Sequence, residues 1–246
     1  QQIIEILRKE AVPALGCTEP VACALACAKC KEVLGGVPER LDVLVSGNIY
    51  KNGMGVGIPG TGMVGLPIAA ALGAVCGKSE YGLEVLKEVN VGDNLQRAKD
   101  MLGQVTVSLK EDAPDKLYAE ALATKGNDTV KVIIAHTHTN IVLVEKNGEE
   151  IFKREFRLDT SKPEDKGPEL SVKRIWDFVH EVDVKDIEFV LQGAEMNKAI
   201  SAEGLNSEYG LQIGKTLKEN IDKGLLEDDL LNRTLIRATA ASDARM

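Results

Sequence analysis

Residues 104–157 decide the fold, and they read QVTVSLKEDAPDKLYAEALATKGNDTVKVIIAHTHTNIVLVEKNGEEIFKREFR. Apolar and polar side chains alternate along several short runs of this stretch, which is the two-residue period of half-buried β-strands. Turn residues separate the runs, with Gly126-Asn127-Asp128 in one place and Asn147-Gly148 in another. Such turns are typical of antiparallel hairpins. The sequence therefore predicts a compact, mainly antiparallel sheet with strands at 105–109, 118–124, 130–135, 141–145 and 151–156.

Helical patterns flank the predicted sheet on both sides. Residues 2–11 carry apolar side chains at helical spacing, and a second helix begins at Thr18 or Glu19 and runs to Gly35. Residues 170–240 read as helices throughout. The predicted fold is therefore α+β, with helical segments at both ends and an inserted sheet in the middle. The expected domains are a helical body from 1–103 and 160–246, which carries a glycine-rich substrate loop, and a sheet-rich inserted subdomain from 104–159.

Composition narrows the class of protein. The 246 residues carry a formal net charge of −8, with 44% hydrophobic and 28% charged residues, which is ordinary for a globular protein. Lys and Arg are scattered, and this argues against nucleic acid or an acidic membrane as a partner, because phosphate binding needs clustered cations. The chain shows neither an apolar run of about 20 residues nor a signal peptide. We expect a cytoplasmic protein with reduced thiols and no membrane partner.

Three of the five cysteines have a spacing that suggests a metal cluster. Cys23, Cys27 and Cys30 form C-x3-C-x2-C, the pattern with which radical-SAM enzymes hold a [4Fe–4S] cluster. On a helix the first and last thiols would be about 10 Å apart along the axis, at about 1.5 Å per residue. The alanines between them favour helix over the loop that a cluster needs. We favour the interpretation that these three thiols are buried and pack like alanine. The alternative is that they bind a cluster in a radical-SAM or redox protein.

Two other patterns leave several interpretations open. Residues 55–60, GVGIPG, match the G-x-G-x-x-G fingerprint of dinucleotide-binding proteins, but Pro59 removes an N–H donor from the cradle. A loop that binds a small carboxylate through backbone N–H groups, or a plain tight turn, fits as well. His136 and His138 lie two apart on a predicted strand and would share a face. Three interpretations stay open for these histidines: a pair of metal ligands, part of the wall of a substrate pocket, or part of a sheet edge.

Four stretches together resemble the L-cysteine desulfidase family, whose relatives include the α chain of iron–sulfur L-serine dehydratase. They are PALGCTEP at 13–20, SGNIYKNGMGVGIPGTG at 46–62, HTHTN at 136–140 and AASDARM at 240–246. The resemblance implies α,β-elimination of L-cysteine to hydrogen sulfide, ammonia and pyruvate, without pyridoxal phosphate, at a [4Fe–4S] cluster held by cysteines. It also implies that this chain is the N-terminal part only. The C-terminal part of the family would be absent, and the fragment would be inactive and hold no intact cluster.

The resemblance also implies roles for individual residues. Cys17 corresponds to the cysteine of the N-terminal motif, expected as a cluster ligand or as the base, with the other ligands beyond Met246. A helix N-terminus would favour its thiolate. Lys51 is the second catalytic candidate. The expected substrate-binding residues are Thr18, Glu19, Ser46, Asn48, Asn52, Gly57, Gly60, Thr61, His138, Thr139 and Asn140.

Several alternatives stay open at this point. Iron–sulfur L-serine dehydratase would convert L-serine to pyruvate and ammonia by the same chemistry. A non-catalytic module that binds a small anion in the glycine-rich loop, with Cys17 idle, belongs to a different class. The identity of the base, the nature of the end at Met246 and the oligomeric state, a homo-oligomer included, also stay open.

Overall fold

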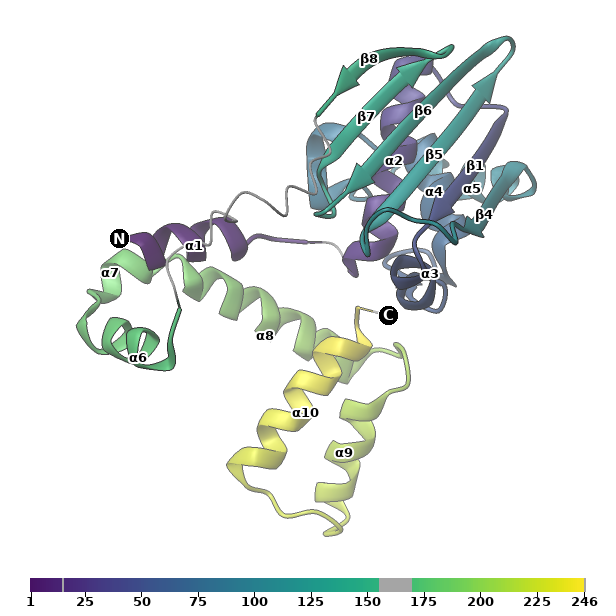
Figure 1. The fold of residues 1–246 in the computed structure, drawn as a ribbon. Coiled ribbons are helices and arrows are strands. Elements are labelled where there is room, and N and C mark those ends of the chain that lie inside the picture. Colours follow the sequence, from purple (N-terminus) through teal and green to yellow (C-terminus); the bar gives the residue numbers. More distant parts are fainter. Residues whose placement is uncertain (15, 155–169, 246) are drawn as a thin grey trace. The chain divides into compact units, whose positions relative to one another are not determined.

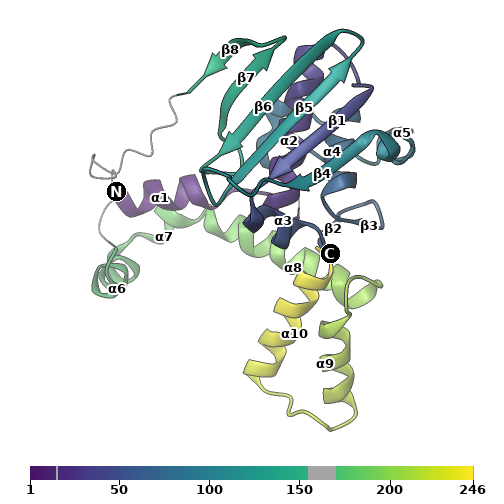
Figure 2. The same cartoon turned by 45° about the vertical axis from the view of Figure 1, so that its right-hand side comes forward.

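The computed structural model describes residues 1–14, 16–154 and 170–245. Contacts between Cα atoms divide the chain into two units (Figure 1 and, in a second view, Figure 2). One unit is Ala14–Phe156 with Arg245–Met246, and it contains the sheet. The other is Gln1–Pro13 with Arg157–Ala244, and the regular elements among its described residues are α-helices.

The sheet-bearing unit is built on six strands in the order β4-β1-β5-β6-β7-β8. β1 runs parallel to β4, and the other four neighbouring pairs are antiparallel. Two hairpin turns use Gly126 and Gly148 at φ of 56° and 83°, where a side chain would be strained. The predicted α+β fold with a mainly antiparallel sheet is therefore confirmed. The strands are β1 (Arg40–Val45), β4 (Val105–Leu109), β5 (Tyr118–Lys125), β6 (Asp128–Ala135), β7 (Ile141–Lys146) and β8 (Glu149–Lys153).

Two apolar helices cover one face of this sheet. α2 (Thr18–Leu34) contacts β5 and β6, while α4 (Leu66–Val75) contacts α2 and β4 (Figure 2). Residues 20–28 of α2 are all buried. Small side chains allow the two helices to approach closely, because a Cβ atom added to Gly73 would lie 2.1 Å from the Ala24 carbonyl oxygen. The unit also contains α3 (Gly47–Gly53), β2 (Gly57–Ile58), β3 (Met63–Val64), η1 (Ser79–Glu84), α5 (Asn94–Met101) and η2 (Leu102–Gln104).

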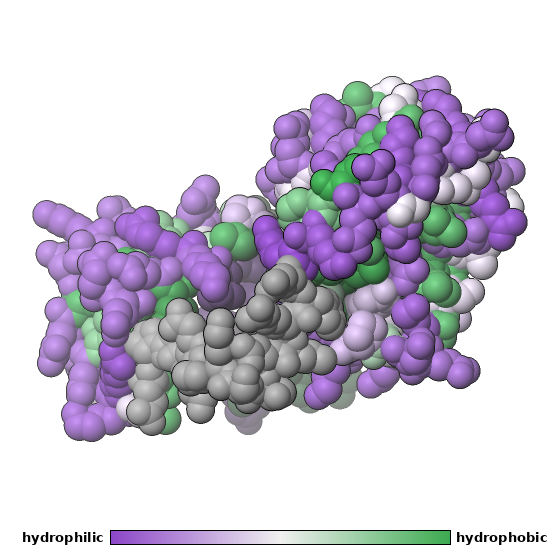
Figure 3. All heavy atoms as spheres, turned by 45° about the horizontal axis from the view of Figure 1, so that its top comes forward, coloured by the Kyte–Doolittle hydropathy of each residue, from purple (hydrophilic) through white to green (hydrophobic). Residues whose placement is uncertain are grey.

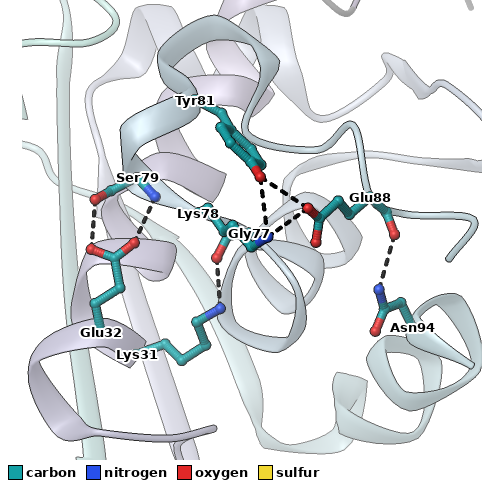
Figure 4. Close-up of polar contacts among 8 residues, drawn as sticks. All are labelled: Lys31, Glu32, Gly77, Lys78, Ser79, Tyr81, Glu88 and Asn94. Carbon is teal, nitrogen blue, oxygen red and sulfur yellow. Dashed lines mark hydrogen bonds and ion pairs between the residues drawn. The ribbon is translucent and has the colours of Figure 1, made fainter. Parts of the chain in front are cut away.

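The segment between α4 and α5 is held against α2 by polar contacts (Figure 4). Glu32 of α2 accepts hydrogen bonds from the backbone N–H of Ser79 at 2.7 Å and from its hydroxyl at 2.6 Å. Burial disfavours the Glu32 carboxylate, but the hydrogen bonds from Ser79 together with the hydrogen bond and charge of Lys29 keep the pKa of Glu32 below its usual value. Farther along, Glu88 accepts from Lys78 at 2.7 Å and from the Tyr81 hydroxyl at 3.0 Å. These contacts fix the segment although η1 contributes no buried residue.

The second unit is helical, and its longer helices pack very closely. A Cβ atom added to Gly204 would lie 1.9 Å from the Ala240 carbonyl oxygen, and one added to Gly214 would lie 2.6 Å from the Ala240 Cβ. The unit also exposes large apolar side chains such as Trp176 (65%) and Leu230 (82%). Its helices are α1 (Gln2–Glu10), α6 (Val172–Glu181), α7 (Val184–Ile187), α8 (Val190–Asn206), α9 (Ile213–Asp222) and α10 (Leu230–Asp243).

Apolar residues also reach the surface elsewhere. Figure 3 shows them in green between hydrophilic residues in purple on one face of the molecule. No helix in the part of the chain that the structure describes is both long and apolar enough to cross a membrane.

The boundaries of the two units differ from the domain boundaries that we expected from the sequence. We expected 104–159 to form a subdomain separate from the preceding helices. Instead α2 and α4 pack on the sheet, and β1 lies between β4 and β5 within it. The physical reason is that the apolar face of the sheet needs cover, and the apolar helices before it supply that cover. The separate helical unit contains residues 1–13 and 170–244 of the described chain.

The contact between α2 and α4 makes a testable prediction. We expect Gly73→Ala to lower the free energy of unfolding by about 1–3 kcal/mol, because the new methyl group would overlap the backbone of α2. Urea denaturation followed by far-ultraviolet circular dichroism measures this. Gly103→Ala is the matched control, since a Cβ atom added at that position has no neighbour within 4 Å. Equal stability of the two variants would contradict the packing described.

Candidate functional site

Three stretches that are far apart in the sequence meet at the N-terminus of α2. Gly16, just before the helix, has a φ of +76°. A Cβ atom added to it would lie 3.0 Å from Pro59 Cγ in the glycine-rich stretch and 4.0 Å from the Arg245 carbonyl oxygen. Glycine is needed here for both reasons, positive φ and close approach. The N-terminal motif, the glycine-rich stretch and Arg245 therefore form one local cluster within the sheet-bearing unit.

Cys17 is the N-cap residue of α2, and its thiol is exposed. Its backbone is extended, and its side chain makes no capping hydrogen bond. Partial burial and then the charge of Glu19 raise the pKa of the Cys17 thiol, while the charge of Arg245 opposes them. We expected the helix N-terminus to favour the thiolate. In the structure the pKa of the Cys17 thiol is raised instead, because desolvation and the Glu19 carboxylate outweigh the favourable charges.

Glu19 is the electrostatic centre of the cluster. Its two carboxylate oxygens accept from Asn52 Nδ2 at 3.3 Å and from the Thr18 hydroxyl at 3.4 Å. Burial lowers the pKa of His138, and the charge of Glu19 partly offsets this effect. The imidazole is therefore neutral near pH 7. Thr18, Glu19, Asn52 and His138 were all predicted as binding residues, and the structure brings them into one neighbourhood with Cys17.

Other predicted binding residues have structural partners. The buried Ser46 hydroxyl caps α3 and donates to the Lys116 carbonyl at 2.6 Å. The Thr61 hydroxyl is buried as well and donates to the Ile58 carbonyl at 2.6 Å. Gly57 is buried in β2. These polar groups hold the backbone of α3 and of the β2–β3 hairpin.

The glycine-rich stretch forms a small hairpin rather than a loop that cradles phosphate. β2 pairs with β3, and Gly60 lies between them at a φ of +78°. A Cβ atom added to Gly60 would lie 2.5 Å from Asn90 Nδ2. Of the open alternatives, the tight turn fits this geometry. Asn48 and Lys51 are exposed on α3, and within the described residues no hydrogen bond joins either of them to Cys17 or Glu19.

The predicted histidine strand is a turn. β6 ends at Ala135, and residues 136–139 are bends and turns before β7 begins. His136 has a φ of +69°, and its Nδ1 lies 2.6 Å from Asp115 Oδ2. His138 instead comes under the charge of Glu19. The expectation that the two imidazoles share a strand face was wrong, because the chain reverses immediately after β6.

Thr139 and Asn140 complete this turn. Asn140 Nδ2 donates to the Ala135 carbonyl at 2.9 Å, and its side-chain oxygen accepts from Arg154. Thr139 is exposed. Both were predicted as pocket-wall residues for the substrate. The hydrogen bonds of the Asn140 side chain, to Ala135 and from Arg154, close the turn and do not reach the cluster around Cys17.

The other cysteines belong to the core. Cys23, Cys27 and Cys30 are fully buried, as the interpretation of packed thiols requires. Burial raises the pKa of Cys23 to about 12, and Cys30 Sγ donates to the Ala121 carbonyl at 3.5 Å. Among the described residues no group of three His, Cys, Asp or Glu side chains is arranged to hold a metal. Of the five cysteines only Cys17 is exposed, and the other four are buried. The cysteines of this chain alone therefore do not match the ligand set of a [4Fe–4S] cluster, which several cysteine thiolates hold.

Arg245 and Gly16 were not among the residues predicted from the sequence. Both lay in the quoted motifs, so the signal was present, but nothing in the sequence indicates that residue 245 returns to the start of α2. The positive φ of Gly16 also follows from the tertiary contact with Pro59 and not from a recognisable turn pattern.

The chain is similar over its full length to proteins from several bacteria. It is 48% identical over 248 residues to a UPF0597 protein of Actinobacillus pleuropneumoniae serotype 3, covering 100% of this chain and 57% of the relative. A UPF0597 protein of Dichelobacter nodosus shows the same identity and coverage. One from Aeromonas hydrophila is 45% identical, covering 99% of this chain and 56% of the relative. No family model and no solved structure matches the chain.

These comparisons correct one prediction. The relatives carry the name UPF0597 protein and not L-cysteine desulfidase, so the assignment to the L-cysteine desulfidase family was wrong. The motifs that suggested it are real features of the sequence, but short shared motifs are weaker evidence than identity across the whole chain. The chain spans little more than half the length of these relatives.

The charges around Cys17 predict the order of its reactivity with iodoacetamide. Glu19→Gln removes a charge that raises the thiol pKa, so alkylation at pH 8 should become faster. Arg245→Gln removes a charge that lowers the pKa, so alkylation should become slower. Mass spectrometry follows the modification, and Glu111→Gln, on the exposed 111–112 turn, serves as the control. A shift of the two site variants in the same direction would refute the arrangement.

Proposed function

We propose that this chain supplies the amino-acid-binding part of a lyase that eliminates the β-substituent of L-cysteine, giving hydrogen sulfide, ammonia and pyruvate. L-Serine, with hydroxide as the leaving group, is the alternative substrate. One observation carries the proposal. Glu19 and Arg245, with opposite charges, both act on the Cys17 thiol at the N-terminus of a 17-residue helix. The proposal depends on this site and not on family membership.

The charges suit the two ends of a zwitterionic amino acid. The guanidinium of Arg245 and the N-terminal N–H groups of α2 attract a carboxylate. The Glu19 carboxylate, which already accepts hydrogen bonds from Asn52 and Thr18, attracts an ammonium group. An amino acid held between them would present its side chain near the Cys17 thiol. A ligand with only a carboxylate or only an ammonium group would interact favourably with one of these two charges and would therefore bind less tightly than a zwitterion.

The titratable groups suit an elimination. A base removes the Cα proton, the Cβ–S bond breaks, and its electron pair stays on sulfur, which then takes up a proton. The released 2-aminoacrylate tautomerises and reacts with one water to give pyruvate and ammonia. The neutral His138 imidazole is able to accept a proton, and Cys17, with its raised pKa, is able to donate one to the departing sulfide. The predicted role of Lys51 stays a prediction, as does the predicted cluster with ligands outside this chain.

Calorimetric titration tests the binding step. We expect L-cysteine to bind at least about tenfold more tightly than cysteamine, which lacks the carboxylate, or 3-mercaptopropionate, which lacks the ammonium group. Arg245→Gln should remove the preference over cysteamine, and Glu19→Gln the preference over 3-mercaptopropionate. Arg97→Gln in α5 controls for a change in net charge.

Sulfide and pyruvate release tests the chemical step separately. The chain and the longer Actinobacillus pleuropneumoniae relative would be incubated anaerobically with iron, sulfide and then L-cysteine or L-serine, with Cys17→Ser as the variant of this chain. Amino-acid binding without product from either protein would favour the non-catalytic module. Absence of binding would reject the proposed site altogether.

A further inference from the structure

A pocket of about 490 Å³ lies between the C-terminal half of α2 and strands β7 and β8. Five of its eight lining residues are apolar, namely Val33, Ile141, Val144, Ile151 and Phe152. Lys29, another lining residue, is ten positions beyond Glu19 on α2, which corresponds to about 15 Å at 1.5 Å per residue. The Lys29 end of the pocket is therefore distant from the cluster around Cys17, whereas Thr139, the residue after His138, lines the end nearer to that cluster. The volume of the pocket is in the range of about 300–1,000 Å³ that is typical of small-molecule sites.

The sheet explains why the pocket exists. α2 packs on β5 and β6, so β7 and β8 extend beyond the face of the sheet that it covers. The register of β7 and β8 shifts next to Val144, which pairs with Phe152, while the following pair joins Glu145 to Glu150. Ile151 is thus the extra residue of a bulge. The bulge allows two successive apolar side chains, Ile151 and Phe152, to line the same pocket.

Two cations line this apolar pocket. Lys29 Nζ lies 3.3 Å from Glu32 Oε2, but the Glu32 carboxylate also accepts two hydrogen bonds from Ser79. Arg154 donates to the neutral Asn140 side chain and lies 5.8 Å from the centre of the Phe152 ring. The lining residues include no acid. With the Glu32 carboxylate beside Lys29, the three charged groups leave this region with one net positive charge, in a chain whose formal net charge is −8.

We propose that this pocket binds a medium-chain organic carboxylate, with the apolar chain against the β7–β8 wall and the carboxylate between Lys29 and Arg154. The Thr139 hydroxyl, which also lines the pocket, is able to donate a third hydrogen bond. Arginine recognises a carboxylate through two parallel N–H groups, whereas an alcohol offers no charge to either cation. A ligand of this class combines the two properties of the pocket, an apolar interior and two cations.

Octanoate is the probe for this site. Two-dimensional ¹H–¹⁵N spectra of the isotope-labelled chain would be recorded during titration with octanoate, octanol or octylamine. We expect octanoate to shift amide signals of β7, β8 and the last turns of α2, with a dissociation constant at least tenfold lower than that of octanol. Octylamine should not bind. The double variant Lys29→Gln/Arg154→Gln should weaken octanoate at least tenfold, while Lys125→Gln should leave it unchanged.

A second variant keeps the test independent of the double variant's stability. Ile151→Glu places a carboxylate in the pocket at a position that is 53% exposed, so the fold should tolerate it and octanoate binding should be lost. Equal binding of octanol and octanoate, shifts confined to residues outside the pocket, or unchanged affinity in either variant would overturn the proposal.

Discussion

The contact between α2 and α4 is the interaction on which the rest of the sheet-bearing unit depends. Gly73 allows the backbone of α4 to reach the backbone of α2 at Ala24, so the two helices form one apolar layer over the sheet. Nine successive residues of α2, 20–28, are buried in this layer. A helix that is buried all round over this stretch has little freedom to rotate or slide. Both of its ends are therefore fixed points on the surface of the unit.

Each end of α2 then acquires a different chemical character. At the N-terminus, Cys17 and Glu19 face residues from α3, from the turn after β6 and from the return of the chain at Arg245. At the other end, the sheet extends past the helix, and apolar side chains of β7 and β8 remain accessible. Opposite charges gather at the first end, and cations without a lining acid at the second. The same rigid element thus supports two sites of different polarity.

The features that were predicted correctly from the amino-acid sequence are those that depend on residues close together along the chain. The alternation in residues 118–135 and the turn at Gly126 define a hairpin by local rules, and the hairpin is present. The alanines around Cys27 likewise identified a helix with packed thiols. Such patterns need no knowledge of the tertiary structure.

The features that sequence missed depend on contacts between distant segments. His136 and His138 fit a strand pattern, but the chain turns there, and each imidazole is influenced by a different carboxylate. A helix N-terminus suggested a reactive thiolate at Cys17, yet desolvation and Glu19 reverse that expectation. Charge balance at a site is a sum over groups that only the fold brings together, so no single motif determines it.

The distribution of thiols has a consequence for the behaviour of this 246-residue chain in air. Cys17 is exposed, whereas Cys23, Cys27, Cys30 and Cys76 are buried, so oxidation is able to join copies of the chain at one position only. A single linkage point joins molecules in pairs and does not build chains or networks. Loss of reducing conditions should therefore produce covalent dimers that leave the native packing intact, with the N-terminus of α2 closed by the partner.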